Sequence, residues 1–174
     1  MTLASTVPPW VIVARPDDAE VRAALAAMTT DGVVRHLRGA HMSNPAAVFA
    51  EFADKLEFPP YFGHNWYALV DCLDDLHGSW HGRRPVVVVV ESADDLATRD
   101  FFPLLVALLC EAAERANLSL DADGQPRTRP PFPLHFVFFV ESPPEVARSL
   151  SSRDDLTCAV TDNRLDISAT QESR

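Results

Sequence analysis

The fold is decided by residues 58–76, which read Phe-Pro-Pro-Tyr-Phe-Gly-His-Asn-Trp-Tyr-Ala-Leu-Val-Asp-Cys-Leu-Asp-Asp-Leu. The two consecutive prolines fix φ and disfavour helical backbone in the residue before each, so the stretch begins as an extended loop. Gly63 permits a turn with positive φ. Asn65 is a good helix cap, because its side-chain oxygen can accept a hydrogen bond from an N–H group of the first turn. The stretch therefore predicts a stiff aromatic loop that leads into a helix from Trp66.

The expected helix has an apolar side and an acidic side. Its apolar residues recur at spacings of three and four, which indicates one buried stripe made of Trp66, Leu69, Cys72, Leu73 and Leu76. At about 100° per residue, the opposite side carries Tyr67, Asp71, Asp74 and Asp75. The like charges of Asp71 and Asp75 disfavour the helix, and the helix dipole disfavours acids near its C-terminal end. A solvated face is the ordinary interpretation, and a surface kept for binding is the alternative.

Composition limits the classes of partner. The chain has 174 residues, of which 47% are hydrophobic, and this is typical of one globular domain. Its formal net charge of −10 argues against nucleic acid as a direct partner, because phosphates would be repelled. The same charge suits a basic protein partner, or it keeps the protein soluble. No apolar run reaches the ~18 residues of a membrane span, and residues 1–15 lack a secretory signal, so we expect a cytoplasmic protein without a membrane partner.

Metal and catalytic chemistry find little support in the sequence. The three cysteines are far apart and form no CxxC pair, so neither a disulfide framework nor a zinc site is indicated. His77 and His81 are four residues apart, and on a helix that spacing could hold a metal ion. The neighbouring glycines disfavour a helix there, and the sequence indicates no third ligand. A small metal-dependent hydrolase is therefore the weakest alternative, and we expect no catalytic residue, metal or cofactor.

Strands and helices alternate along the rest of the chain. Five consecutive valines at residues 86–90 indicate a strand that is buried on both faces, as in a parallel sheet covered by helices. A helix is expected from a cap at Asp17 to a stop at Gly32. The other expected elements are strands at 10–13, 33–37 and 134–140, helices at 44–56 and 104–113, a loop or short helix at 92–99, a long loop at 121–133, weak helix and strand signals at 146–150 and 158–160, and a frayed end. This alternation predicts an α/β fold with a largely parallel sheet.

Residues 59–73 follow the pattern Pro-x-Tyr-Phe-Gly-x-Asn-x-x-Ala-Leu-x-Asp-Cys-Leu. This pattern resembles the signature of the barstar family, which comprises small intracellular inhibitors of ribonucleases. The resemblance implies a small parallel three-stranded sheet packed by helices, formed by residues 33–141. Residues 1–32 are expected to be an extra β-α unit that extends this sheet, and residues 142–174 a partly ordered C-terminal extension. The Pro-rich segment 125–133 is interpreted as an insertion.

The resemblance also implies a function. In the family, a loop and a helix occlude the active site of a basic ribonuclease, and carboxylates stand where RNA phosphates would lie. The family's dominant aspartate falls on Asp71, its loop tyrosine on Tyr61, and a glutamate of a later helix on Glu111, with Glu114 as the alternative. The partner-binding residues expected on this basis are Tyr61, Phe62, Gly63, Asn65, Tyr67, Val70, Asp71, Asp74, Asp75 and Glu111. The expected partner is a basic secreted-type ribonuclease or a related toxin domain, as in toxin–antitoxin immunity.

Two residues depart from the family pattern. Tyr67 stands where well-known members carry a second aspartate, and Val70 stands where they carry an aromatic residue. Asp74 and Asp75 are expected to compensate, since both lie on the same side of the helix as Asp71. These departures leave open a second function, a barstar-like module for protein–protein interaction whose target is not a ribonuclease.

Overall fold

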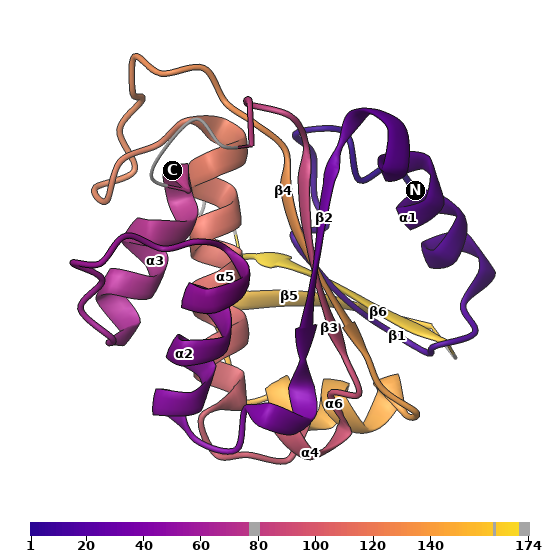
Figure 1. Ribbon diagram of the computed structural model, residues 1–174. Coiled ribbons are helices and arrows are strands. Elements are labelled where there is room, and N and C mark those ends of the chain that lie inside the picture. Colours follow the sequence, from indigo (N-terminus) through magenta and orange to yellow (C-terminus); the bar gives the residue numbers. More distant parts are fainter. Residues whose placement is uncertain (77–80, 162, 171–174) are drawn as a thin grey trace.

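Six strands form one mixed sheet in the computed structural model, which describes residues 1–76, 81–161 and 163–170 (Figure 1). The strand order is β2-β3-β4-β1-β6-β5. Parallel pairing joins β2 to β3, β3 to β4 and β4 to β1, whereas β6 runs antiparallel to both β1 and β5. The strands are β1 Val11–Ala14, β2 Val33–Arg38, β3 Val86–Glu91, β4 Leu134–Phe139, β5 Leu156–Val160 and β6 Arg164–Ala169. The predicted α/β class is confirmed, and the sheet is larger than the three strands of the expected central unit.

Helices cover both faces of the sheet. Helix α1 lies on one face, and α2, α3 and α5 lie on the other (Figure 1). The helices are α1 Ala19–Asp31, α2 Pro45–Lys55, α3 Trp66–Asp75, α4 Asp94–Ala97, α5 Phe102–Leu118 and α6 Pro143–Leu150, with a 3₁₀ turn η1 at Gly39–His41. No helix within the described ranges is long and apolar enough to cross a membrane.

The valine-rich strand β3 shows why the sheet is covered on both sides. Successive side chains of a strand point to opposite faces. Val86, Val88 and Val90 pack in the core beneath α2, α3 and α5, and Val87 and Val89 pack in the smaller core beneath α1. All five are fully buried, as the sequence predicts.

Two local predictions need correction. The cap of α1 is Asp18, whose carboxylate accepts a hydrogen bond from the Val21 N–H; Asp17 instead accepts one from the Arg15 guanidinium. The end of the chain is expected to be frayed, but residues 164–169 form β6; residues 171–174 lie outside the described residues. This strand pairs with β1 because Leu165 and Ile167 alternate inward and are fully buried. Residues from the expected N-terminal unit, central unit and C-terminal extension thus all contribute strands to one sheet.

Candidate partner-binding site

The loop before α3 is held in place by aromatic packing. Phe62 is buried, with its ring centroid 5.0 Å from that of Phe58 and 6.3 Å from that of Phe49 on α2. The Phe62 N–H donates to the Pro59 carbonyl at 2.9 Å. Phe62 is therefore an internal anchor of the loop rather than a surface contact, which corrects its expected place among the partner-binding residues. The loop owes its rigidity to this anchor.

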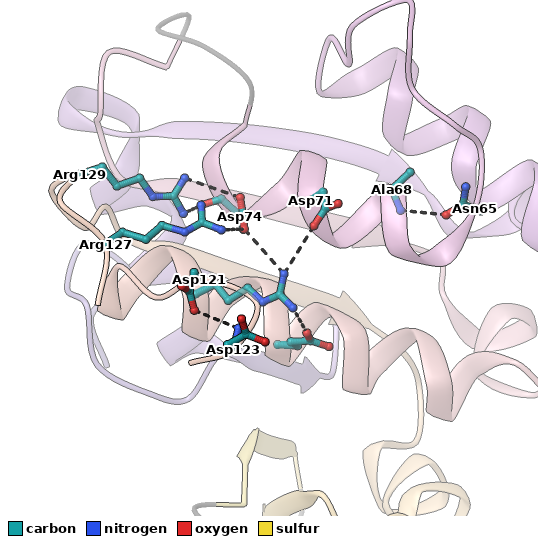
Figure 2. Close-up of polar contacts among 10 residues, drawn as sticks. Asn65, Ala68, Asp71, Asp74, Asp121, Asp123, Arg127 and Arg129 are labelled. Carbon is teal, nitrogen blue, oxygen red and sulfur yellow. Dashed lines mark hydrogen bonds and ion pairs between the residues drawn. The ribbon is translucent and has the colours of Figure 1, made fainter. Parts of the chain in front are cut away.

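Asn65 joins the loop to the helix. Its side-chain oxygen accepts a hydrogen bond from the Ala68 N–H at 2.9 Å, as predicted (Figure 2). Its amide donates to the Gly63 carbonyl at 3.2 Å. The positive φ expected at Gly63 occurs at the next residue, His64, where φ is 47°. The Asn65 amide leaves little room beside Gly63, since a Cβ there would lie 3.0 Å from its nitrogen. Because residue 63 has no side chain, the Asn65 amide can approach the loop and donate to the Gly63 carbonyl.

Three polar or aromatic side chains face outward beside this loop. Tyr61 is 74% exposed and Tyr67 is 86% exposed. The Asp71 side chain, one turn after Tyr67 on α3, is 69% exposed. Val70, which stands between them in the sequence, is buried in the core, so its expected role as a contact is also corrected. The side of α3 that reaches solvent is therefore defined by Tyr67 and Asp71.

Asp74 is not part of this exposed face, and the prediction that places it there is wrong. Its side chain is 3% exposed. Arg127 donates to its carboxylate at 3.1 Å, and Arg129 lies 3.6 Å from the same carboxylate and donates to the Asp74 carbonyl at 2.6 Å (Figure 2). Helix α3 packs on α5, and the loop that follows α5 covers the end of α3. Asp74 is thus an internal anchor for that loop.

Arg115 on α5 connects the remaining acids. Its guanidinium lies 3.6 Å from Asp71 and 3.9 Å from Asp74, and it donates to Glu111 one turn earlier on α5. Only 12% of the Arg115 side chain is exposed, whereas 44% of Glu111 is exposed. Arg115, a largely covered cation, therefore brings together Asp71 and Glu111, two expected partner-binding residues from separate helices. The sequence signal for Arg115 is its i+4 spacing from Glu111, which is common on helices and marks no particular site.

The long loop after α5 is ordered by its own hydrogen bonds. The Ser119 carbonyl accepts a hydrogen bond from the Arg127 N–H at 2.7 Å, and the Ser119 hydroxyl donates to the Arg129 carbonyl at 2.5 Å. The Asp121 carboxylate accepts from the Asp123 N–H at 2.9 Å (Figure 2) and from the Gln125 N–H at 2.8 Å. These bonds hold the two arginines of the loop in position to reach α3. The Pro-rich segment thus contributes to the architecture of the site.

The other expected site residues lie as follows. Asp75 is the last residue of α3, and only its backbone is described. Glu114, the alternative to Glu111, lines a groove between α5 and the start of β5.

His77, one of the two histidines whose spacing could hold a metal ion, lies outside the described residues. His81 is buried, its Nδ1 accepts from the Arg83 N–H at 3.1 Å, and its ring lies 4.8 Å from that of Phe132.

Among the described residues, no group of three or more His, Cys, Asp or Glu side chains is placed to hold a metal ion. The outward side chains near α3 instead combine rigid aromatic rings with carboxylates on a helical scaffold. Tyrosine and paired charges of this kind are typical of protein-recognition surfaces. The site therefore has the features of a protein-binding surface on an α/β domain.

Comparison with known proteins places the chain within this class. A family model described as Barstar (barnase inhibitor) matches residues 33–128, more than half of the 174 residues. The match includes the aromatic loop, α3 and α5, and it ends within the loop that carries Arg127 and Arg129. The chain belongs to the barstar family, a family of inhibitors. No protein in the search of curated proteins matches the chain.

Proposed function

We propose that this protein binds a basic ribonuclease, or a related toxin domain, and occludes its active site. The observation that carries the proposal is the placement of Asp71, an exposed carboxylate on a rigid helix that follows an anchored aromatic loop. In this role Asp71 stands where an RNA phosphate would lie. The Arg, Lys or His side chains of the enzyme that bind phosphate would bind the carboxylate instead.

The contact surface that we propose consists of the exposed residues Tyr61, Gly63, Asn65, Tyr67 and Asp71, together with the half-buried Glu111 and with Asp75. The two tyrosines supply contact area at a low cost in conformational entropy. Phe62 and Val70 support this surface from the core, and Asp74 supports it by holding the loop that follows α5. The net charge of −10 accelerates encounter with a basic partner and makes the association rate dependent on salt.

A second candidate function is binding to a target other than a ribonuclease. The observation that favours it is the 3.6 Å approach of Arg115 to Asp71, which compensates part of the negative charge that a cationic enzyme would meet. Tyr67, at a position where the family carries an acid, reduces that charge further and offers an aromatic ring that is almost fully exposed. A partner with fewer cations and more apolar surface fits these two features.

The test of the first proposal is direct inhibition. A panel of basic ribonucleases is titrated with the protein, and both RNA cleavage and one-to-one binding are measured. Asp71→Ala should weaken binding by about 2–5 kcal/mol, since it leaves a cation of the enzyme buried and unpaired. Asp31→Ala is the matched control, because Asp31 is an exposed aspartate at the end of α1, on the opposite face of the sheet.

Two outcomes separate the candidates. If the cleavage activity of every ribonuclease persists in excess protein, the ribonuclease proposal fails. If affinity capture then recovers a protein that is not a ribonuclease, and the interaction depends on Tyr67 more than on Asp71, the second candidate stands. We also propose the cytoplasm as the compartment, because a reducing environment suits a chain with three free cysteines.

A further inference from the structure

The two ends of the sheet differ in how they are protected. An edge strand exposes N–H and C=O groups that can pair with another chain, and charged residues commonly block such pairing. The edge strand β2 carries Arg35, His36 and Arg38. The edge strand β5 reads Leu-Thr-Cys-Ala-Val, with neither charge nor proline. The β5 edge is therefore the unguarded end of the sheet.

Hydrogen bonding shows which groups of β5 face outward. The Thr161 N–H donates to the Arg164 carbonyl at 2.7 Å, and the Thr170 N–H donates to the Asp155 carbonyl at 2.9 Å. In an antiparallel pair the bonded residues alternate, so residues 157 and 159 bond β6 as well. The N–H and C=O groups of Leu156, Cys158 and Val160 therefore point to the open edge. Within the described chain, the Leu156 N–H makes one long turn contact of 3.4 Å with Arg153.

The side chains of these same three residues share one face of the strand. Leu156 and Cys158 pack against the core, and Val160 is 52% exposed. Leu156 also lines the groove that β5 forms with Ala107 and Leu108 of α5. The strand thus presents three outward backbone positions, and each carries an apolar side chain on the α5 side of the sheet.

We propose that β5 is a self-association edge, at which two copies of this chain pair their β5 strands antiparallel about a two-fold axis at Cys158. In this register Cys158 of one copy lies opposite Cys158 of the other. Leu156 of each copy lies opposite Val160 of the other copy. Every outward backbone group of the strand finds a partner, and both outer pairs join apolar side chains. Val160 of the second copy, opposite Leu156, would lie at the rim of the groove that Leu156 lines. The match of apolar side chains at all three outward positions is the argument for a second copy as the occupant.

The association should be weak and should depend on salt. A single pair of five-residue strands buries less surface than a stable dimer requires, so Kd in the range of about 10 μM to 1 mM is expected. Each copy carries a charge of −10, and the two copies repel each other. Added salt screens that repulsion and should strengthen the dimer. The protomer keeps its own core, so the monomer remains folded on dilution.

Sedimentation equilibrium from micromolar to millimolar protein is the first test. The average mass should rise from 19.2 kDa towards twice that value as concentration and salt increase. Val160→Lys should lower the association constant by at least about tenfold, because it places a charge opposite Leu156. Ala27→Lys adds the same charge at an exposed residue of α1, away from β5, and should leave association intact. A monomer at all concentrations, or equal effects of the two variants, would overturn the proposal.

Disulfide trapping tests the register itself. The proposed register places residue 157 of one copy opposite residue 159 of the other in a non-hydrogen-bonded pair, whose Cα spacing of about 4.5 Å suits a disulfide. In a Cys158→Ser background, Thr157→Cys protein mixed with Ala159→Cys protein should cross-link on oxidation, and neither variant alone should do so. Cross-linking of either variant with itself at the rate of the mixture would refute this register. The ribonuclease proposal is independent of both tests.

Discussion

The Arg115 guanidinium on α5 lies 3.6 Å from the Asp71 carboxylate on α3, so the acid that the family resemblance marks for a partner already has a counter-ion within the chain. Arg115 also donates to Glu111 and is itself mostly buried. The pair is therefore positioned before any partner arrives. A cationic partner meets a carboxylate whose geometry is fixed and whose charge is partly compensated.

Removal of Arg115 should make the surface more attractive to a cationic partner. Arg115→Met keeps most of the apolar length of the side chain but leaves Asp71 and Glu111 uncompensated. If the proposed function holds, association with a basic ribonuclease should become about threefold to tenfold faster at low salt. Stopped-flow measurements at two ionic strengths would also show a steeper salt dependence.

Arg148→Met is the control for this variant. Arg148 is an exposed arginine on α6, so the substitution changes the net charge equally without touching the site. An unchanged association rate for Arg115→Met, or an equal acceleration in both variants, would mean that the internal counter-ion does not govern encounter.

The two aspartates near the end of α3 should differ sharply in their effect on stability. Asp74→Asn removes the buried carboxylate that Arg127 and Arg129, both partly exposed, share, and it should lower the free energy of unfolding by about 1–3 kcal/mol. Asp71→Asn should cost less than about 1 kcal/mol, because this carboxylate is exposed. Urea unfolding of the two variants, monitored by circular dichroism, measures the difference. Equal losses would show that the loop after α5 is not held by Asp74.

Local sequence patterns predict α3 and its cap well. The spacing of Leu69, Cys72 and Leu73 defines the buried side, and the cap at Asn65 acts on N–H groups only a few residues away. The alternating burial of β3 follows in the same way from its run of valines. Such features depend on neighbours within one or two turns of the chain, so the sequence carries them directly.

The burial of Asp74 could not be predicted in this way. It depends on Arg127 and Arg129, which are more than fifty residues away and lie in a segment without periodicity. The sequence does not predict strand β6, for a related reason. Its inward residues Leu165 and Ile167 give only two positions of the alternation that is typical of a strand. Two positions indicate a strand only when β1 is known to have an open edge with which it can pair.

Glu51 should make the stability of the protein sensitive to acid. Its carboxylate on α2 is buried and accepts from the Arg38 N–H at 2.9 Å and from the Arg38 guanidinium. Burial raises the pKa of Glu51, but the hydrogen bonds from Arg38 outweigh it, so the folded pKa lies below the ordinary value. The stabilisation is complete above the unfolded pKa of about 4.3 and is lost as the pH falls through the lower folded pKa.

Glu51→Gln tests this linkage. At pH 7 the variant should be about 1–3 kcal/mol less stable than the parent protein, because hydrogen bonds to a buried charged group are weakened. The difference between the two proteins should shrink as the pH falls below about 4.3. Urea unfolding between pH 3 and 8 measures it, and Glu57→Gln, at an exposed glutamate beside Arg35, is the control. A difference that stays constant with pH would show that Glu51 does not titrate as described.

The cap at Asn65 should act on binding as well as on stability. Asn65 and Asn44 cap α3 and α2 with the same 2.9 Å hydrogen bond, so replacement of either by alanine should cost about 1 kcal/mol of stability. Only Asn65 also donates to the Gly63 carbonyl, which holds the aromatic loop against the helix. Asn65→Ala should therefore weaken partner binding by about tenfold, whereas Asn44→Ala should leave it unchanged, because only the former releases a segment of the contact surface.

Calorimetric titration of the partner with both variants, at a temperature where both are folded, compares the two affinities directly. Equal affinities would show that the loop keeps its position without the cap, and Phe62 alone would then account for its rigidity.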